Sequence, residues 1–229
     1  AGGFVAVRVI ARYLLCVSCL GLCLISFPAN ASIVSSGDID PVYNGLDDPW
    51  DTGILGVGIT GLGELTVSGG SLVTSSSGLI GINYSSTGTV RIEDATSGWT
   101  VYSVVEVGIR GEGNLHIISG ANVSGRSGVI GRHVGDFDSR VCVSGAGSSW
   151  TNLNTLTVGY GNDGLLHILD GGSVTSFWGT VGVYNSERGS SEVTVSGVGS
   201  SWINTDQLTI AKFGDGSLRV SDGGFVSSR

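Results

Sequence analysis

The strongest constraint on this fold is a segment of about 51 residues that recurs along the chain. Its fullest copy, Leu156 to Asn204, reads LTVGYGNDGLLHILDGGSVTSFWGTVGVYNSERGSSEVTVSGVGSSWIN. Val-Gly dipeptides ending at Gly58, Gly108 and Gly159 mark the same point in successive copies. Self-similarity at this period is typical of solenoids, in which each repeat packs only on its neighbours. We expect a repeat domain over 54–229, with repeats at 54–103, 104–154 and 155–206 and a truncated copy at 207–229.

Each repeat divides into two halves, since a second dipeptide of a β-branched residue and glycine follows the first after 23 residues, as Ile80-Gly81, Ile130-Gly131 and Val181-Gly182. Short runs such as Leu65–Val67 and Val90–Ile92 alternate apolar and polar residues between stretches of Gly, Ser, Asn and Asp. This pattern predicts short strands joined by tight turns, and no helical period follows residue 54. A half-repeat is long enough for about three short strands, which is one rung of a parallel β-helix.

The predicted fold is therefore all-β, a right-handed parallel β-helix (β-solenoid) of about seven rungs with two rungs per repeat. Apolar residues of the alternating runs, among them Ile168 and Val220, should point inward and form aliphatic ladders. A left-handed β-helix is less favoured because its hexapeptide period is absent. A propeller has blades near this length, but the doubled half-repeat suits coils better.

The N-terminal 31 residues have the features of a secretory signal peptide. Arg8 and Arg12 precede the apolar run Tyr13–Phe27, and Ala29-Asn30-Ala31 supplies an A-x-A cleavage site. The formal charge is −8 with this segment and −10 without its two arginines (−8 − 2). Such a balance excludes nucleic acid and anionic membrane surfaces as partners, because both reward basic patches. We expect a secreted or cell-surface location, with membrane contact only through the signal peptide during export.

The segment 32–53 differs from the repeats, since it contains five aspartates and two prolines. The spacing of the aspartates does not match a calcium-binding loop, so we expect a cap on the first rung instead. Three of the four cysteines lie in the predicted signal peptide, which leaves Cys142. A lone thiol cannot form an intramolecular disulfide. Because Cys142 takes the outward position of Arg91 and Thr194, we expect it to be accessible for thiol-linked self-association. End-to-end association of the solenoid is the other route to self-association.

Each candidate site residue has both a functional and a structural interpretation. His116 and His167 occupy the same repeat position, two rungs or about 10 Å apart, which is too far for one zinc ion, so we expect them to be exposed surface histidines. Asp170 and Asp222 each precede a Gly-Gly pair. Aspartate before glycine is common in turns, and the alternative is that the two carboxylates act together as acid catalysts. The sequence assigns no catalytic, cofactor-binding or metal-binding residue and no cofactor. The aromatic candidates are of two kinds: Trp99, Trp150 and Trp202 recur and are expected to pack over a corner, whereas Trp178, Tyr84, Tyr160 and Tyr184 are expected to be exposed.

The repeat resembles that of bacterial autotransporter (type V secretion) passengers and PEP-CTERM-associated exported proteins. The matching elements are Gly171-Gly172, Gly223-Gly224, and the segments SGAGSSWTN at Ser144–Asn152 and SGVGSSWIN at Ser196–Asn204. The resemblance covers about 54–229 and implies an exported bacterial β-solenoid. It favours a non-enzymatic structural or adhesive protein of the cell surface or extracellular matrix. The alternative is a carbohydrate-binding or polysaccharide-cleaving β-helix, and extracellular polysaccharide or cell-surface components are the expected partners.

Overall fold

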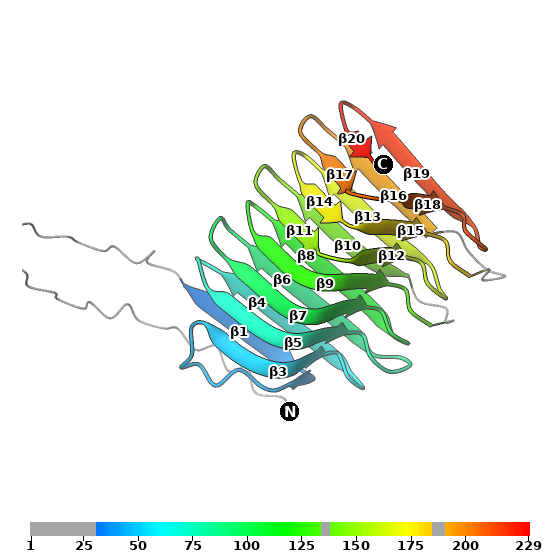
Figure 1. Ribbon diagram of the computed structural model, residues 1–229. Coiled ribbons are helices and arrows are strands. Elements are labelled where there is room, and N and C mark those ends of the chain that lie inside the picture. Colours follow the sequence, from blue (N-terminus) through cyan, green and yellow to red (C-terminus); the bar gives the residue numbers. More distant parts are fainter. Residues whose placement is uncertain (1–30, 134–137, 185–190) are drawn as a thin grey trace, which may run out of the picture.

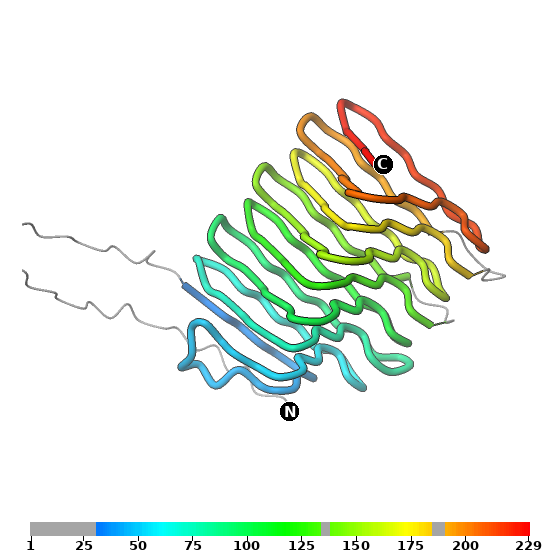
Figure 2. Tube along the Cα trace, in the orientation of Figure 1, coloured from blue at the N-terminus to red at the C-terminus, as the bar shows by residue number. Residues whose placement is uncertain are grey.

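The computed structural model describes residues 31–133, 138–184 and 191–229, which form an all-β solenoid (Figure 1). The trace winds through seven rungs from β3 at one end to β19 and β20 at the other (Figure 2). Within these ranges there is no helix, so none could cross a membrane. The predicted fold class is confirmed. The predicted signal peptide falls on residues 1–30, outside the described part of the chain, apart from Ala31.

One sheet takes one strand from every rung, and its strands pair in parallel. Register partners such as Leu65, Val90 and Leu115 are 25 residues apart, so one rung uses half a repeat. Both inward residues of each rung are fully buried, except in the last rung. The strands are β4 (Leu62–Ser68), β6 (Thr87–Glu93), β8 (Glu112–Ile118), β10 (Ser139–Ser144), β13 (Gly164–Leu169), β16 (Ser191–Ser196) and β19 (Gly216–Ser221).

The second sheet closes each rung and bends midway. In the early rungs one long strand accommodates the bend by a register shift, as between Ser75 and Gly78, so these rungs have two strands rather than the expected three. In the later rungs the bend breaks the strand in two. The long strands are β3 (Trp50–Val57), β5 (Leu72–Ile80), β7 (Gly98–Val107) and β9 (Asn122–Ile130). The short ones are β11 (Ser149–Asn152), β12 (Thr155–Val158), β14 (Ser173–Ser176), β15 (Trp178–Val181), β17 (Ser201–Asn204), β18 (Leu208–Ile210) and β20 (Phe225–Ser227).

The leading segment adds two antiparallel strands to the first rung. β1 (Ser32–Gly37) pairs with β4, and β2 (Ile39–Asp40) pairs with β3. Between them, Asp38 accepts hydrogen bonds from the backbone N–H groups of Thr60 and Gly61, and the bond from Thr60 is the main cause of the lowered pKa of this carboxyl. These contacts support the proposal that residues 32–53 cap the solenoid, although β3 already begins inside that segment.

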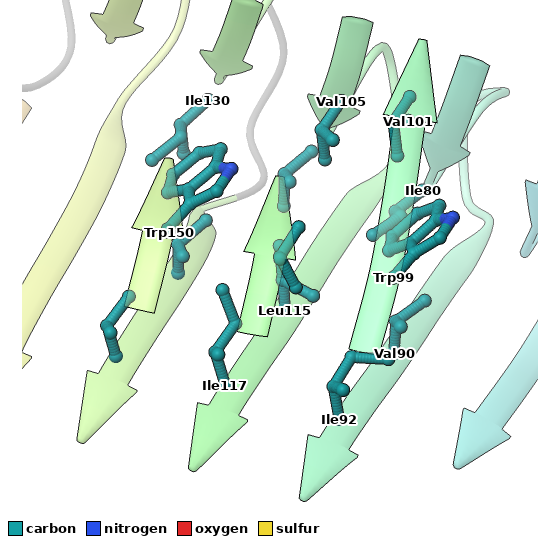
Figure 3. Packing of buried hydrophobic residues seen from close by; sticks show 14 of the residues in the cluster. Ile80, Val90, Ile92, Trp99, Val101, Val105, Leu115, Ile117, Ile130 and Trp150 are labelled. Carbon is teal, nitrogen blue, oxygen red and sulfur yellow. The ribbon is translucent and has the colours of Figure 1, made fainter. Parts of the chain in front are cut away.

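The core explains why the sequence repeats every two rungs. Trp99, Trp150 and Trp202 are almost completely buried, so they pack inside the solenoid and not over a corner as expected. Figure 3 shows Trp99 and Trp150 among the aliphatic side chains of the interior. A tryptophan on every rung would overfill the interior, and a valine takes its place on alternate rungs. The valine rungs also provide a glycine, such as Gly78 or Gly128, where a Cβ atom would overlap the next tryptophan ring. We call the residues that stack at this position of the second sheet, one from each rung, the tryptophan column. From the first rung to the last they are Trp50, Val73, Trp99, Val123, Trp150, Val174, Trp202 and Val226.

Candidate functional site

A groove lies on the outer face of the second sheet, over the short strands β12, β15 and β18. Its volume is about 260 Å³. Pairing of these strands aligns Thr155 with Trp178, and Thr180 with Thr209, so side chains that are distant in sequence line one hollow. Gln207 and Lys212 add an amide and an ammonium group. The groove therefore combines one aromatic ring with several hydrogen-bonding groups.

Trp178 is exposed but held in place. Its side chain is 43% exposed, and its Nε1–H donates to Asp206 Oδ2 at 3.1 Å. Phe177 packs edge-to-face against it, with ring centroids 4.8 Å apart. The exposure expected from the sequence is confirmed, and these two contacts fix the ring's orientation before any ligand arrives.

The repeats indicate that the side chain of Trp178 is not needed for the fold. Trp178 precedes Gly179, and the equivalent positions before Gly78 and Gly128 are Ser77 and Ser127. Those earlier rungs form the same sheet with a serine at this point. The core tryptophans recur in every repeat, whereas Trp178 has no counterpart. A residue that departs from the repeat and stays exposed is a better candidate for binding than one that recurs and is buried.

Three other exposed aromatics, all of them tyrosines, lie in the turns between the two sheets and are not among the residues that line the groove. Tyr84, Tyr160 and Tyr184 are 63%, 41% and 55% exposed, which agrees with the sequence analysis. Tyr160 and Tyr184 pack edge-to-face at 5.1 Å, and the guanidinium of Arg110 lies 5.9 Å from the Tyr84 ring centroid. These rings mostly contact one another and nearby side chains, and they line no hollow with Trp178.

The first sheet brings together two histidines and a cysteine that lie far apart in the sequence. Cys142 aligns with His116 on one side and His167 on the other. All three lie on the outer face of the sheet, between inward apolar residues, as expected, but they are half-buried rather than exposed because paired neighbouring strands cover part of each side chain. Burial is the main cause of the lowered pKa of both imidazoles and of the raised pKa of the Cys142 thiol. In the described ranges no group of three or more His, Cys, Asp or Glu side chains is placed to hold a metal ion.

Asp170 and Asp222 act in turns. Both have left-handed backbone angles, with φ of 53° and 52°, which aspartate tolerates better than most residues. Ser144 Oγ donates to Asp170 at 3.3 Å, and Ser196 Oγ donates to Asp222 at 2.8 Å. The second bond is the main cause of the lowered pKa of Asp222. The contacts thus favour the turn interpretation over a pair of acid catalysts.

Comparisons with known proteins give one partial likeness. The chain is 33% identical over 93 residues to the adhesin BmaC autotransporter of Brucella suis biovar 1 (strain 1330). The matched stretch is 40% of this chain and only 3% of that adhesin. No family model matches the chain, and no solved structure does. The likeness agrees with the resemblance to autotransporter passengers, and nothing in the comparisons supports the resemblance to PEP-CTERM-associated proteins.

Proposed function

We propose that this chain is the solenoid part of an exported bacterial surface protein with a structural and adhesive role. The observation that carries the proposal is the combination of a seven-rung solenoid with a 93-residue stretch similar to an autotransporter adhesin. A secreted or cell-surface location and passage through an N-terminal signal peptide belong to the same proposal.

The geometry suits adhesion rather than catalysis. A solenoid buries its apolar residues in a narrow interior and leaves long, regular outer faces for contact. Here the interior is filled by tryptophan and aliphatic ladders, so it has no room for a substrate. The outer faces are rich in serine and threonine, and the charge of −8 favours solubility at a cell surface. Extracellular polysaccharide or components of another cell's surface are the partners that we propose.

Cell adhesion tests this function. A strain that lacks the gene should attach less well than the parent strain to surfaces coated with extracellular polysaccharide or host cells. Complementation with the full gene should restore attachment. Unchanged attachment of the deletion strain on every surface would contradict the adhesive role, and an effect on growth with polysaccharide as carbon source would favour a degradative enzyme.

A carbohydrate-binding role is the second candidate, and the groove at Trp178 is the observation that favours it.

We also propose that Cys142 can link two chains after local opening, since the thiol is free but half-buried.

A further inference from the structure

We propose that the groove over β12, β15 and β18 binds one ring of a neutral polysaccharide whose hydroxyl groups are equatorial, with the sugar stacked on Trp178. This inference rests on the proposed adhesive function and deepens it, because it names the class of ligand and the place where it binds.

The size of the groove fits a single sugar ring. Pockets for drug-sized ligands start at about 300 Å³, and this groove, at about 260 Å³, lies just below that size. It is open to solvent along the outer face of the sheet, so neighbouring sugars of a polymer can continue over the adjacent rungs.

The lining matches the two sides of a pyranose. When all hydroxyl groups are equatorial, the ring has an apolar face of C–H groups and a polar rim. The exposed indole of Trp178 supplies a flat apolar surface for the face. Thr180 and Thr209 offer hydroxyl groups that both donate and accept hydrogen bonds, and Gln207 offers an amide for the rim. A purely apolar ligand would leave these polar groups without partners.

The charge around the groove favours a neutral sugar. Lys212 is the cation in its lining, and the carboxylate of Asp206 lies at the edge of the Trp178 ring. The whole chain carries −8, which repels anionic polymers such as polyuronates. We therefore assign Lys212 the role of a hydrogen-bond donor to a sugar hydroxyl rather than that of a partner for a carboxylate or sulfate.

The departure from the repeat provides the test variants. Trp178→Ser installs the residue that the earlier rungs have at this position in Ser77 and Ser127, so the sheet should form as before. Lys212→Ile likewise installs the residue that follows the corner glycine at Ile59 and Ile109. The control variant is Tyr102→Ser, which removes a ring that is 69% exposed and lies in β7, outside the groove.

Affinity electrophoresis measures the binding. The protein and its variants run in native gels that contain hydroxyethylcellulose, a neutral glucan with equatorial hydroxyl groups, or polygalacturonate, an anionic polymer. The wild-type protein and Tyr102→Ser should be retarded by the glucan and not by polygalacturonate. Trp178→Ser should bind the glucan about tenfold more weakly, since losing an aromatic contact costs roughly a factor of ten in affinity. Lys212→Ile should show a smaller loss. Thermal melting confirms that each variant is folded.

Three results would overturn the inference: no retardation of the wild-type protein by the glucan, equal retardation of Trp178→Ser, or stronger retardation by polygalacturonate. If Trp178→Ser does not fold, Lys212→Ile and quenching of Trp fluorescence by soluble glucan oligosaccharides in the wild-type protein decide the question. Failure here leaves the adhesive function intact if the deletion strain still attaches poorly. Failure of the adhesion experiment with retention of glucan binding would instead identify a sugar-binding protein that is not an adhesin.

Discussion

A single glycine leaves a gap in the hydrogen bonds of the tryptophan column. Trp99 Nε1–H donates to Ser75 Oγ at 3.0 Å, and Trp202 Nε1–H donates to Ser176 Oγ at 3.2 Å. Gly125 takes the place of this serine in the middle repeat. Among the described residues, the buried Nε1 of Trp150 has no hydrogen-bond partner, and neither does the side chain of its neighbour Asn152. We therefore expect Gly125→Ser to stabilise the protein.

The magnitude follows from two contributions. The new hydroxyl would accept from Trp150 and donate to Asn152, as Ser176 does to Asn204 at 2.7 Å, and one such bond contributes about 1 kcal/mol. Replacing a glycine whose backbone other residues can adopt adds about 0.4–1 kcal/mol through the unfolded state. The nearest atom to a Cβ at position 125 would be Val101 O at 3.4 Å, which is an ordinary contact. Together these give about 1–2 kcal/mol.

Urea denaturation of three variants separates the contributions. Gly125→Ala should gain only the backbone part, so the difference between the serine and alanine variants measures the hydrogen bond. Gly128→Ser should destabilise the protein, because its Cβ would overlap the ring of Trp150. A midpoint for Gly125→Ser that is no higher than that for Gly125→Ala would refute the argument that Trp150 lacks a partner.

Three further predictions concern the interior, the half-buried His116 and the Cys142 thiol. Ile168→Ala should cost about 2–5 kcal/mol and Val220→Ala less than about 1, since Ile168 is fully buried and Val220 is 45% exposed; equal losses in thermal melts would contradict this. Burial lowers the folded-state pKa of His116 below 6.5, so the unfolded chain binds more protons below that pH and stability falls as pH drops through 6.5. His116→Thr, which copies Thr66 at the same position of the first repeat, should lose less stability between pH 7.5 and 5, and an unchanged pH dependence in urea melts would refute the argument. The native Cys142 thiol should react with a neutral maleimide more slowly than in urea, with a rate that rises toward high pH, because burial raises its pKa. Equal native and denatured rates would show that the thiol is open.

The sequence was sufficient to predict the number of rungs and the inward ladders. Spacing and alternation are properties of the chain itself, and Leu115 and Ile117 are buried as the alternation requires. The position of the tryptophans was wrong because a period shows that Trp150 recurs but not on which side of the backbone it lies. The inward direction of the Trp150 side chain follows from the pairing of Trp150 with Val123 and from the contact of its ring with Gly128.

The groove and the row of His116, Cys142 and His167 were harder to predict, because both arise only when successive rungs stack and their strands pair. Thr155, Trp178 and Gln207 belong to three successive rungs, and only strand pairing brings them to one hollow. Cys142 lies in the second half of a repeat and His116 in the first, and the halves meet because rungs alternate. Aligning the first half of each repeat with the second half would have shown from the sequence that Cys142 lies beside His116. The singular occurrence of Trp178 was also visible in the sequence, as the one tryptophan of the repeat domain without a counterpart.

Surface exposure on intact cells tests the central claim most directly. Leu153 is 76% exposed between β11 and β12, so a cysteine there should be accessible in the folded protein. Cys142→Thr, which copies Thr194, removes the thiol of the described residues, and Cys16, Cys19 and Cys23 of the predicted signal peptide are replaced by serine in the same background. With Leu153→Cys in that background, a membrane-impermeant maleimide should label the protein on intact producing cells as fully as after lysis. Labelling that appears only after lysis would place the solenoid inside the cell and contradict the proposed surface role.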